Sequence, residues 1–409
     1  MRRFLQGHAT HPDWRMALAL AAAQVEAQRR EVGRATQPTF GWVYFSDHYG
    51  SHAEALLAGL RERWPGVEWI GSSGVGVAAG GVEYFDEPAL TLLLAELPRR
   101  AFRVFSGAAP LRDFAAATAH VHADPGAADL AEMIQDMSGR TRTGYLFGGL
   151  ASARGAARQI ANGVFTGGLS GAAFDDGIEL VSRVTQGCQP VGPLRTVTAV
   201  DGNLVTALDG EPALACLLRD LGLEGAEPRA VVPQLRQTLV GLSDPNDLLS
   251  DGFASVVRNG AFGSETRVRH LIGLDPARGG IAIGDLADPG MRLAFCHRNV
   301  EAARRDLMRI CAEIREETEP EALPLETAEA LKSAGPGEAV PHSGIAGAIY
   351  VSCAGRGGPH FGAPSAELQI VRHALGDVPL VGFFAAGEIA RHHVYGYTGV
   401  LTVFPSRSI

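Results

Sequence analysis

The two ends of this chain follow the same order of expected elements, and this repetition is the strongest constraint on its fold. Near the N-terminus, a β-type run at 41–45 leads through a polar turn to a helix and then to a strand at 67–70. Near the C-terminus, a strand at 348–351 leads through another polar loop to a helix and then to a strand at 379–384. Strands that alternate with helices are typical of α/β folds, so we interpret the chain as an internal duplication.

The parallel between the two ends extends to single residues. Val67-Glu68-Trp69-Ile70-Gly71 corresponds to Val378-Pro379-Leu380-Val381-Gly382, and each unit closes with an apolar strand, at 89–95 and at 400–404. Ser365 is placed to cap the second helix.

The length of 409 residues exceeds the usual size of one domain core. We expect an α/β protein of mixed α+β character, with two related halves whose mixed, twisted sheets are covered by helices. The expected parts are an N-terminal helix within 1–35, a first domain at 36–240 and a second at 241–409. The stretch at 146–165 reads as loop-rich, and 317–342, rich in Glu, Pro and Gly, as a mobile connection or lid.

Charge and cysteine content exclude several classes of function. The formal net charge is −9 without a basic stripe, so we expect no nucleic-acid partner. No apolar run reaches about 18 residues, so no membrane span is expected, and the alanine-rich segment 16–25 reads as part of a helix. The five cysteines are scattered and include no Cys-x-x-Cys pair, as is typical of reduced thiols in a cytoplasmic protein. We expect no cofactor and no metal.

A glycine-rich segment follows the strand at 67–70. It runs Gly71-Ser72-Ser73-Gly74-Val75-Gly76, and as a loop it could offer backbone N–H groups to an anionic ligand. The loose dinucleotide pattern that begins at Gly74 is rejected, because Gly80-Gly81 stands where a helix should begin. The alternative is a purely structural turn with positive φ angles.

Gly387 and Glu388 follow the strand at 379–384 in the same way, and Arg356 follows the strand at 348–351. Ligands of α/β sheets bind at such strand ends. Glu388 could hold an ammonium group and Arg356 a carboxylate, which together suit an amino acid. The alternative is that the two side chains pair with each other or face water.

Two cysteines at strand ends could be nucleophiles. Cys188 lies beside Gln186, and Cys353 lies beside Ser352. A thiolate nucleophile needs a histidine base, and the chain offers His342, His360, His392 and His393. The alternative is that both thiols are buried and inert.

Two histidine pairs have spacings that metal sites also use, namely His48 with His52 and His120 with His122. Neither pair has the Glu of the His-Glu-x-x-His motif, so structural or solvent-facing roles are expected. The G-x-S-x-G motif of hydrolases and the phosphate loop of nucleotide triphosphatases are absent from the sequence.

Several motifs, in this order, resemble the FIST family over roughly residues 40 to 404. They are the segment from Gly71 to Gly74, Gln186-Gly187-Cys188-Gln189-Pro190, Ser352-Cys353-Ala354-Gly355-Arg356, the strand at 378–384 with Gly387-Glu388, and Tyr395-Gly396-Tyr397-Thr398-Gly399. The resemblance implies an N-terminal and a C-terminal FIST domain that bind small ligands, with amino acids as candidates, in signalling proteins of bacteria and other organisms. It adds six residues to the candidate ligand contacts and implies no catalytic residue. The six are Gln186, Gly187, Cys188, Ser352, Cys353 and Tyr397.

We therefore expect a cytoplasmic small-ligand sensor without an attached output domain. One alternative is an enzyme in which Cys353 or Cys188 attacks a small carboxylate metabolite. The other is an adaptor whose function is to contact a protein partner in signalling.

Overall fold

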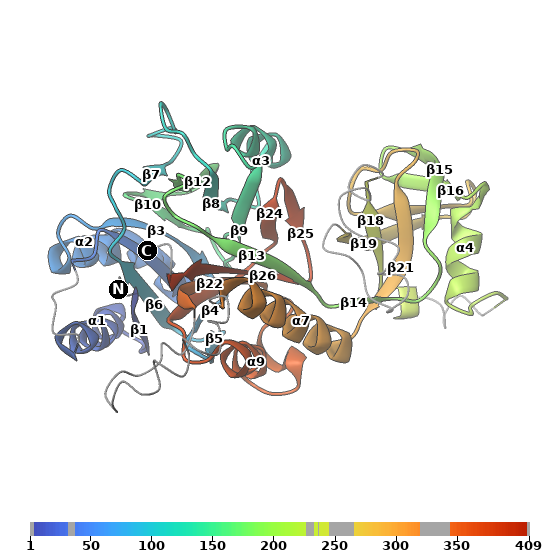
Figure 1. Cartoon of the computed structure of the whole chain (residues 1–409). Helices are drawn as coiled ribbons and strands as arrows, with labels where there is room; N and C mark the ends of the chain where they lie inside the picture. The colour runs from blue at the N-terminus through green and yellow to red at the C-terminus, as the bar shows by residue number, and fades with distance from the viewer. Residues whose placement is uncertain are drawn as a thin grey trace, which may run out of the picture. The chain divides into compact units, whose positions relative to one another are not determined.

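The computed structural model describes residues 4–31, 37–225, 233–235, 237–244, 266–319 and 344–406. The chain divides into two compact units (Figure 1). Unit 1 comprises Met1–Val184, Leu307–Val394 and Gly399–Ile409, and unit 2 comprises Thr185–Asp306 and Tyr395–Thr398. No described helix is long and apolar enough to cross a membrane.

Unit 1 contains three copies of one motif, each built around its own six-stranded sheet. In every copy, a first strand leads through a helix to a second, parallel strand. A hairpin follows, and a return strand then lies antiparallel between the first strand and an edge strand.

The first copy consists of β1 (Phe4–Thr10), α1 (Trp14–Glu31), β2 (Phe40–Ser46), η1 (Asp47–His52), α2 (Ala53–Arg63), β3 (Glu68–Gly74) and β6 (Ala89–Ala95). The second consists of β7 (Phe102–Phe105), β8 (Thr118–Ala123), α3 (Leu130–Gly139), β9 (Tyr145–Leu150) and β12 (Leu169–Phe174). The third consists of β13 (Val181–Gln186), α7 (Val300–Thr318), β22 (Ile345–Cys353), η3 (Gly358–Phe361), α9 (Ala366–Leu375), β23 (Leu380–Ala385) and β26 (Thr398–Pro405).

The copies exchange their hairpins in a cycle. The hairpin of the first copy joins the sheet of the third, that of the third joins the second, and that of the second joins the first. These hairpins are β4–β5 (Gly76–Ala79 and Val82–Phe85), β24–β25 (Glu388–Arg391 and His393–Tyr395) and β10–β11 (Gln159–Ala161 and Val164–Phe165). Each sheet therefore needs strands from another copy to be complete.

One glycine recurs at the same point of each copy, where the second strand passes the first. A Cβ on Gly71, Gly148 or Gly382 would lie 1.8, 1.9 or 1.7 Å from a carbonyl oxygen of the neighbouring strand. No side chain fits at that distance, so the close approach of the two strands requires glycine.

These observations confirm the expected α/β class with mixed sheets and both predicted strand–helix–strand units, which are β2–α2–β3 and β22–α9–β23. The stretch at 146–165, predicted to be loop-rich, contains β9, β10 and β11, while residues 151–158 between β9 and β10 form neither helix nor strand. The sequence also did not reveal the second copy, around β8 and β9, because the strand Thr118–Ala123 carries two histidines and lacks the apolar signal of its counterparts.

The expected domain limits stay a prediction. Residue 240 lies within β18 (Thr238–Ser243) of unit 2. Most of the predicted connection at 317–342 lies outside the described residues, although α7 continues to Thr318.

Unit 2 is a closed antiparallel barrel, in which β21, β15, β16, β20, β19 and β18 pair in turn and β18 pairs again with β21. Val205, Val240, Leu293 and Phe295 are among the buried residues of its core. The elements are β14 (Cys188–Pro190), β15 (Arg195–Asp201), β16 (Leu204–Leu208), β17 (Glu211–Pro212), α4 (Ala213–Asp220), β18 (Thr238–Ser243), β19 (Arg267–Asp275), β20 (Gly280–Ile283) and β21 (Arg292–Arg298).

The inner faces of the three sheets of unit 1 meet in an aromatic core. Phe40 of the first sheet packs edge-on against Phe174 of the second, with ring centroids 5.8 Å apart. Phe174 and Trp42 both contact Phe404 of the third sheet, at 6.5 and 5.4 Å. Burial of these large rings stabilises the association of the three copies.

A chain of polar groups runs through this core. Trp42 Nε1 donates to His120 Nδ1 (3.1 Å), and Tyr44 lies between His120 Nε2 (3.2 Å) and His122 Nε2 (3.3 Å). An indole N–H can only donate, so His120 Nδ1 carries no proton and neutral His120 is protonated on Nε2. Burial lowers the pKa of His120 well below its usual value and that of His122 to about 3. Both side chains are therefore neutral and structural.

Because His120 and His122 are buried and neutral, we expect the folded state to lose stability in acid. Because their pKa values are lower in the folded than in the unfolded chain, the free energy of unfolding should fall as the pH drops from about 6.5 towards 3, by at most about 1.4 kcal/mol per pH unit for each histidine. Denaturant unfolding of His122→Gln between pH 7 and pH 4 should show a shallower pH dependence than the wild type. The same substitution at exposed His373 serves as the control, and an equal change in both variants would contradict the assignment.

Candidate functional site

The residues that the sequence singled out lie in both units. Gly71, Ser72, Ser73, Gly74, Gly76, Ser352, Cys353, Arg356, Gly387 and Glu388 belong to unit 1, and Gln186, Gly187, Cys188 and Tyr397 belong to unit 2.

The segment from Gly71 to Gly76 is not the loop that the sequence suggested. Gly71 to Gly74 form the end of β3, paired with β2, and Gly76 begins β4. Ser72 and Ser73 are fully buried. The N–H of Ser73 donates to Arg158 O (2.9 Å) and that of Val75 to Ser152 Oγ (2.9 Å), so these two donors are already engaged.

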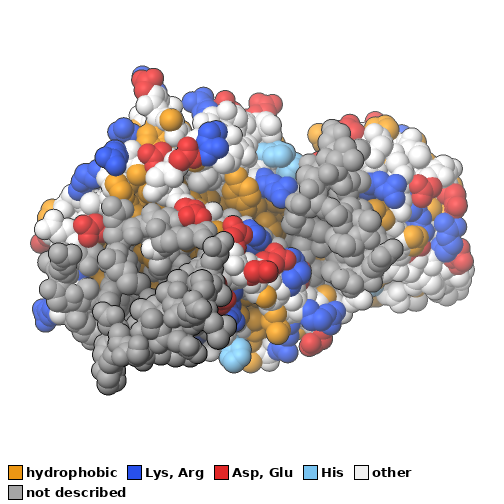
Figure 2. Space-filling view, in the orientation of Figure 1, with side chains coloured by type: hydrophobic (Ala, Val, Ile, Leu, Met, Phe, Trp, Pro, Cys, Tyr) orange, Lys and Arg blue, Asp and Glu red, His pale blue; other side chains and the backbone are white. Residues whose placement is uncertain are grey.

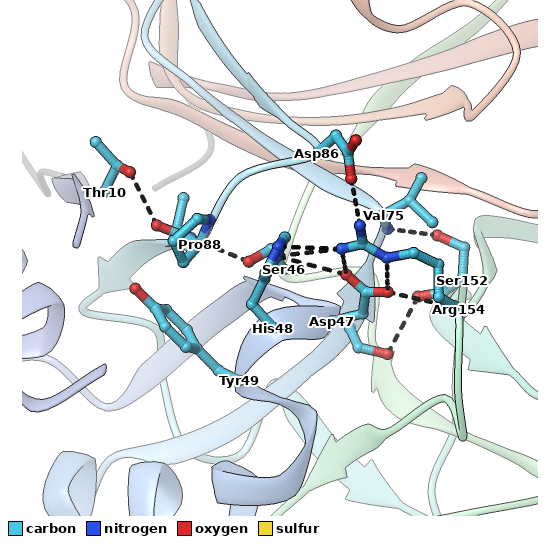
Figure 3. A network of polar contacts seen from close by, with 12 residues as sticks. Thr10, Ser46, Asp47, His48, Tyr49, Val75, Asp86, Pro88, Ser152 and Arg154 are labelled. Carbon is cyan, nitrogen blue, oxygen red and sulfur yellow. Dashed lines mark hydrogen bonds and ion pairs between the residues drawn. The ribbon is translucent and has the colours of Figure 1, made fainter. Parts of the chain in front are cut away.

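A charged network closes the ends of β2 and β3 (Figure 3). Arg154, from the connection between β9 and β10, donates from Nε and Nη2 to the two oxygens of Asp47 (2.9 and 2.7 Å) and also pairs with Asp86. The Nε2 atom of His48 lies 3.2 Å from the Nη2 atom of Arg154. Burial acts to raise the pKa of Asp47, but the hydrogen bonds and charge of Arg154 outweigh it and lower that pKa. The network holds the segment around Arg154 against the end of β2.

A second charged cluster lies at the ends of β22 and β23 and is almost completely buried. Glu367 of α9 accepts hydrogen bonds from Arg356 Nε (2.8 Å), Tyr350 Oη (2.6 Å) and Ser352 Oγ (2.9 Å). Arg356 Nη2 lies 2.6 Å from the same carboxylate. The guanidinium also stacks on Phe361, 5.1 Å from the ring centroid.

Arg356 therefore pairs with Glu367, a partner that the sequence did not suggest. Neither Arg356 nor Glu388 faces water, since both are buried. Burial acts to lower the pKa of Arg356, but the charge of Glu367 and, less strongly, that of Glu388 raise it above its usual value. Arg356, Glu367 and Glu388 thus form one electrostatic group.

Glu83 also belongs to this group and, like Glu367, was missed by sequence reasoning. It lies on β5, is 9% exposed, and neither carboxylate oxygen has a hydrogen-bond partner. Burial, reinforced by the charge of Glu367, raises the pKa of Glu83 to about 7. Nearby N–H groups of Leu368, Gly358 and Ser365 act in the opposite direction, although none of them makes a hydrogen bond of ordinary geometry to it. A charged residue in the apolar run Val82-Glu83-Tyr84-Phe85 was the available signal.

Ser365 also differs from its expected role. It adopts a left-handed φ of 62° before α9 and makes no side-chain cap. Its hydroxyl accepts the N–H of Glu83 (3.0 Å) instead. Ser365 thus connects the hairpin that carries Glu83 to the helix that carries Glu367.

The candidate residues of unit 2 are engaged within the barrel and its neighbouring turn. The N–H of Gln186 donates to Asp306 Oδ2 (2.7 Å), and its side-chain amide donates to Thr266 O (2.7 Å). Gly187 O accepts the N–H of Asn299 (2.9 Å). Tyr397 has a left-handed φ of 61°, and its hydroxyl lies 2.7 Å from His270 Nε2.

The thiols differ in access. Cys353 is half-buried, whereas the other four cysteines, including Cys188, are buried. Burial, with a smaller contribution from neighbouring Cys188, raises the pKa of Cys296 well above its usual value. Among the described residues, no group of three or more His, Cys, Asp or Glu side chains could hold a metal ion.

In the view of Figure 2, basic and acidic side chains are interspersed over the described parts of the surface, with no continuous basic stripe among them. This agrees with the formal net charge of −9.

Comparison with known proteins identifies related sequences over nearly the whole chain. The family model of the FIST N domain matches residues 39–211, and that of the FIST C domain matches residues 213–391. The uncharacterized protein Rv0628c of Mycobacterium tuberculosis is 31% identical over 417 residues, covering 97% of this chain and 98% of its own length. The uncharacterized protein Mb0898c of Mycobacterium bovis is 29% identical over 419 residues, covering 97% of both chains.

The raised pKa of Glu83 generates a prediction for stability. This pKa is higher in the folded than in the unfolded chain. The contribution of Glu83 to the free energy of unfolding is therefore present below about pH 4.5 and is lost as the pH rises through about 7. The loss is on the order of 3 kcal/mol. Glu83→Gln should remove this contribution and be more stable than the wild type at pH 8. Denaturant unfolding at pH 5 and pH 8 measures the difference, with exposed Glu62→Gln as the control. Equal pH dependence in wild type and Glu83→Gln would show that Glu83 titrates normally.

Proposed function

The chain belongs to the FIST family, whose domains are generally sensory domains for small ligands, and from this we propose that it senses a small metabolite that carries a primary ammonium group. Amino acids are the first candidates. The proposed site is the buried charged cluster at the ends of β22 and β23.

The observation that carries the proposal is the environment of Glu83. A buried carboxylate without hydrogen bonds is costly, by several kcal/mol in apolar surroundings, and such groups cluster at functional sites. The charge of neighbouring Glu367 adds to that cost. A ligand ammonium would supply three donors and the missing positive charge.

Glu367 and Arg356 have a different role in this proposal. The guanidinium is held by Glu367 and stacked on Phe361, so releasing it to a ligand carboxylate would leave Glu367 uncompensated. In this proposal Arg356 does not contact the ligand. It fixes the position of Glu367 and affects the ligand through that carboxylate. In this arrangement Glu83 takes the place at the ammonium that the sequence suggested for Glu388.

We propose that the ligand enters through the segment 354–365. It joins β22 to α9 and contains Gly355, Gly357, Gly358 and Gly362, of which the last two have positive φ angles. Glycines allow large changes of φ and ψ, so we propose that this segment opens. Opening would release the contact of Arg356 with Glu367 and that of Ser365 with the N–H of Glu83. We propose that the segment encloses the ligand and that the protein acts in the cytoplasm, where its cysteines stay reduced.

A thermal-shift screen of the purified protein against the twenty amino acids and simple amines tests this function. A ligand at a hundred times its Kd adds about 2.7 kcal/mol of stability. The shift should disappear in Glu83→Gln and persist in Glu62→Gln. A flat screen with a cooperatively folded protein would exclude this ligand class.

The same site predicts a pH dependence of binding. Only ionised Glu83 attracts an ammonium, so the association constant should rise up to tenfold per pH unit below about pH 7 and level off above it. Calorimetric titration of any hit from pH 5.5 to 8.5 measures the slope. A pH-independent association constant would place the ligand away from Glu83.

The enzyme alternative rests on one observation, the access to Cys353 at the end of β22 beside Ser352 and Arg356. If Cys353 is a nucleophile, iodoacetamide should label it at pH 7 much faster than a free cysteine, and Cys353→Ser should abolish the labelling. Under the sensor proposal, labelling is slow, and Cys353→Ser keeps the thermal shift.

A further inference from the structure

We propose that unit 1 holds a second ligand site, a neutral polar pocket between β1, α1 and α9 that takes a polyhydroxylated molecule of about monosaccharide size. The pocket has a volume of about 330 Å³. That volume is near the lower end of the range of ligand pockets, roughly 300 to 1,000 Å³. It is distinct from the charged cluster, since none of Glu83, Arg356, Glu367 and Glu388 lines it.

Three glutamine amides line the pocket in fixed orientations. The side-chain amide of Gln24, on α1, accepts the backbone N–H of His8 (3.1 Å) and donates to its C=O (2.8 Å). The amide of Gln28, also on α1, does the same with the backbone N–H and C=O of Gln6 (3.0 and 2.7 Å). The side chain of Gln6 pairs in the same way with the backbone N–H and C=O of Leu380 (3.1 and 2.9 Å). Every amide is thus held by one donated and one accepted hydrogen bond, which fixes which end is oxygen and which is nitrogen.

Each amide retains hydrogen-bonding capacity. A side-chain amide has two N–H donors and two acceptor lone pairs, and only one of each is used within the described residues. Three held amides therefore offer donors and acceptors in equal number. This alternation suits hydroxyl groups, which both donate and accept.

The pocket has no net charge. Arg372 pairs with Asp377 (2.6 Å), so these two lining residues neutralise each other. His8, the remaining lining residue that can titrate, contacts the hydroxyl of Tyr84 (2.6 Å), and burial lowers its pKa. A charged ligand would lose hydration without gaining a partner of opposite charge, whereas a neutral one would not.

The other walls are apolar or close to the backbone. Leu368, Val371 and Leu375 of α9 line the pocket but are almost completely buried, so they offer a ligand little carbon surface. The turn Gly80-Gly81, which also lines the pocket, has positive φ angles. A Cβ on Gly81 would come within 2.8 Å of Arg372 Cδ, so the two glycines keep this wall open.

The amides have a structural effect as well, because they satisfy the outer edge of strand β1, which is an edge strand of its sheet. Edge protection accounts for Gln24 and Gln28. It does not account for Gln6, whose side chain reaches across the pocket to β23. The experiment must therefore separate binding from edge protection.

Saturation-transfer NMR and calorimetry of the full chain, with glucose, ribose and myo-inositol as probes, test the proposal. At least one probe should bind, and Gln24→Leu should weaken its binding about tenfold, because a donor and an acceptor are lost. Ala27→Leu, on an exposed neighbouring position of α1, is the matched control and should bind like the wild type. Glu83→Gln should also leave sugar binding unchanged, which separates this pocket from the ammonium site.

Two results would overturn the proposal. One is a wild-type protein that is folded and binds none of the three probes at their highest soluble concentrations. The other is binding that Gln24→Leu and His8→Phe both leave unchanged, since the probe would then lie elsewhere. If Gln24→Leu lowers the melting temperature, binding is compared at a temperature where all variants are folded.

Discussion

The cyclic exchange of hairpins is the constraint on which the rest of unit 1 depends. The parallel strand pairs β2–β3, β8–β9 and β22–β23 each have one side completed by a hairpin from another copy. Removing any hairpin would expose a sheet edge in another copy and open the aromatic core between them. The three copies should therefore fold as one cooperative unit, although each has the connectivity of a small α/β motif. The glycines Gly71, Gly148 and Gly382 recur in the three copies, because each allows the close approach of the second strand to the first.

The repetition also places two charged clusters at equivalent strand ends, with different energetic consequences. The side chains of Arg154 and Asp47 are 54% and 6% exposed, whereas those of Arg356 and Glu367 are 1% and 0% exposed. An ion pair that is partly exposed to water, such as that of Arg154 with Asp47, holds a segment in place but adds little to the free energy of unfolding. A buried pair contributes little net stability unless all its members are satisfied, and Glu83 beside it makes no hydrogen bond. This contrast is why we assign ligand binding to the second cluster and a fastening role to the first.

The order of strands and helices along the chain was easier to predict from the sequence than the contacts between distant segments. The helix–strand alternation around residues 40–74 and 348–385 was readable because apolar runs are interrupted by polar turns at regular points. The second copy was hidden, since β8 carries His120 and His122, whose burial depends on Trp42 and Tyr44 of another copy. Arg356 and Glu388 were correctly noticed as unusual, but their neighbour Glu367 sits in a helix turn where a solvent-facing carboxylate is the ordinary expectation. Glu83 could not be placed at all, because its hairpin joins a sheet whose other central strands lie more than 260 residues further along the chain.

The two proposed sites share two structural elements, and this has consequences for any ligand response. On α9, Glu367 belongs to the charged cluster, while Leu368, Val371 and Arg372 line the neutral pocket. On the β4–β5 hairpin, Glu83 belongs to the cluster, while Gly80 and Gly81 line the pocket. A ligand that shifts either element changes the geometry of both sites, and linkage requires any such effect on affinity to be reciprocal. Helix α9 and the β4–β5 hairpin therefore contribute to both the charged site and the neutral one. They are the parts of unit 1 through which the binding of two chemically different ligands could be coupled.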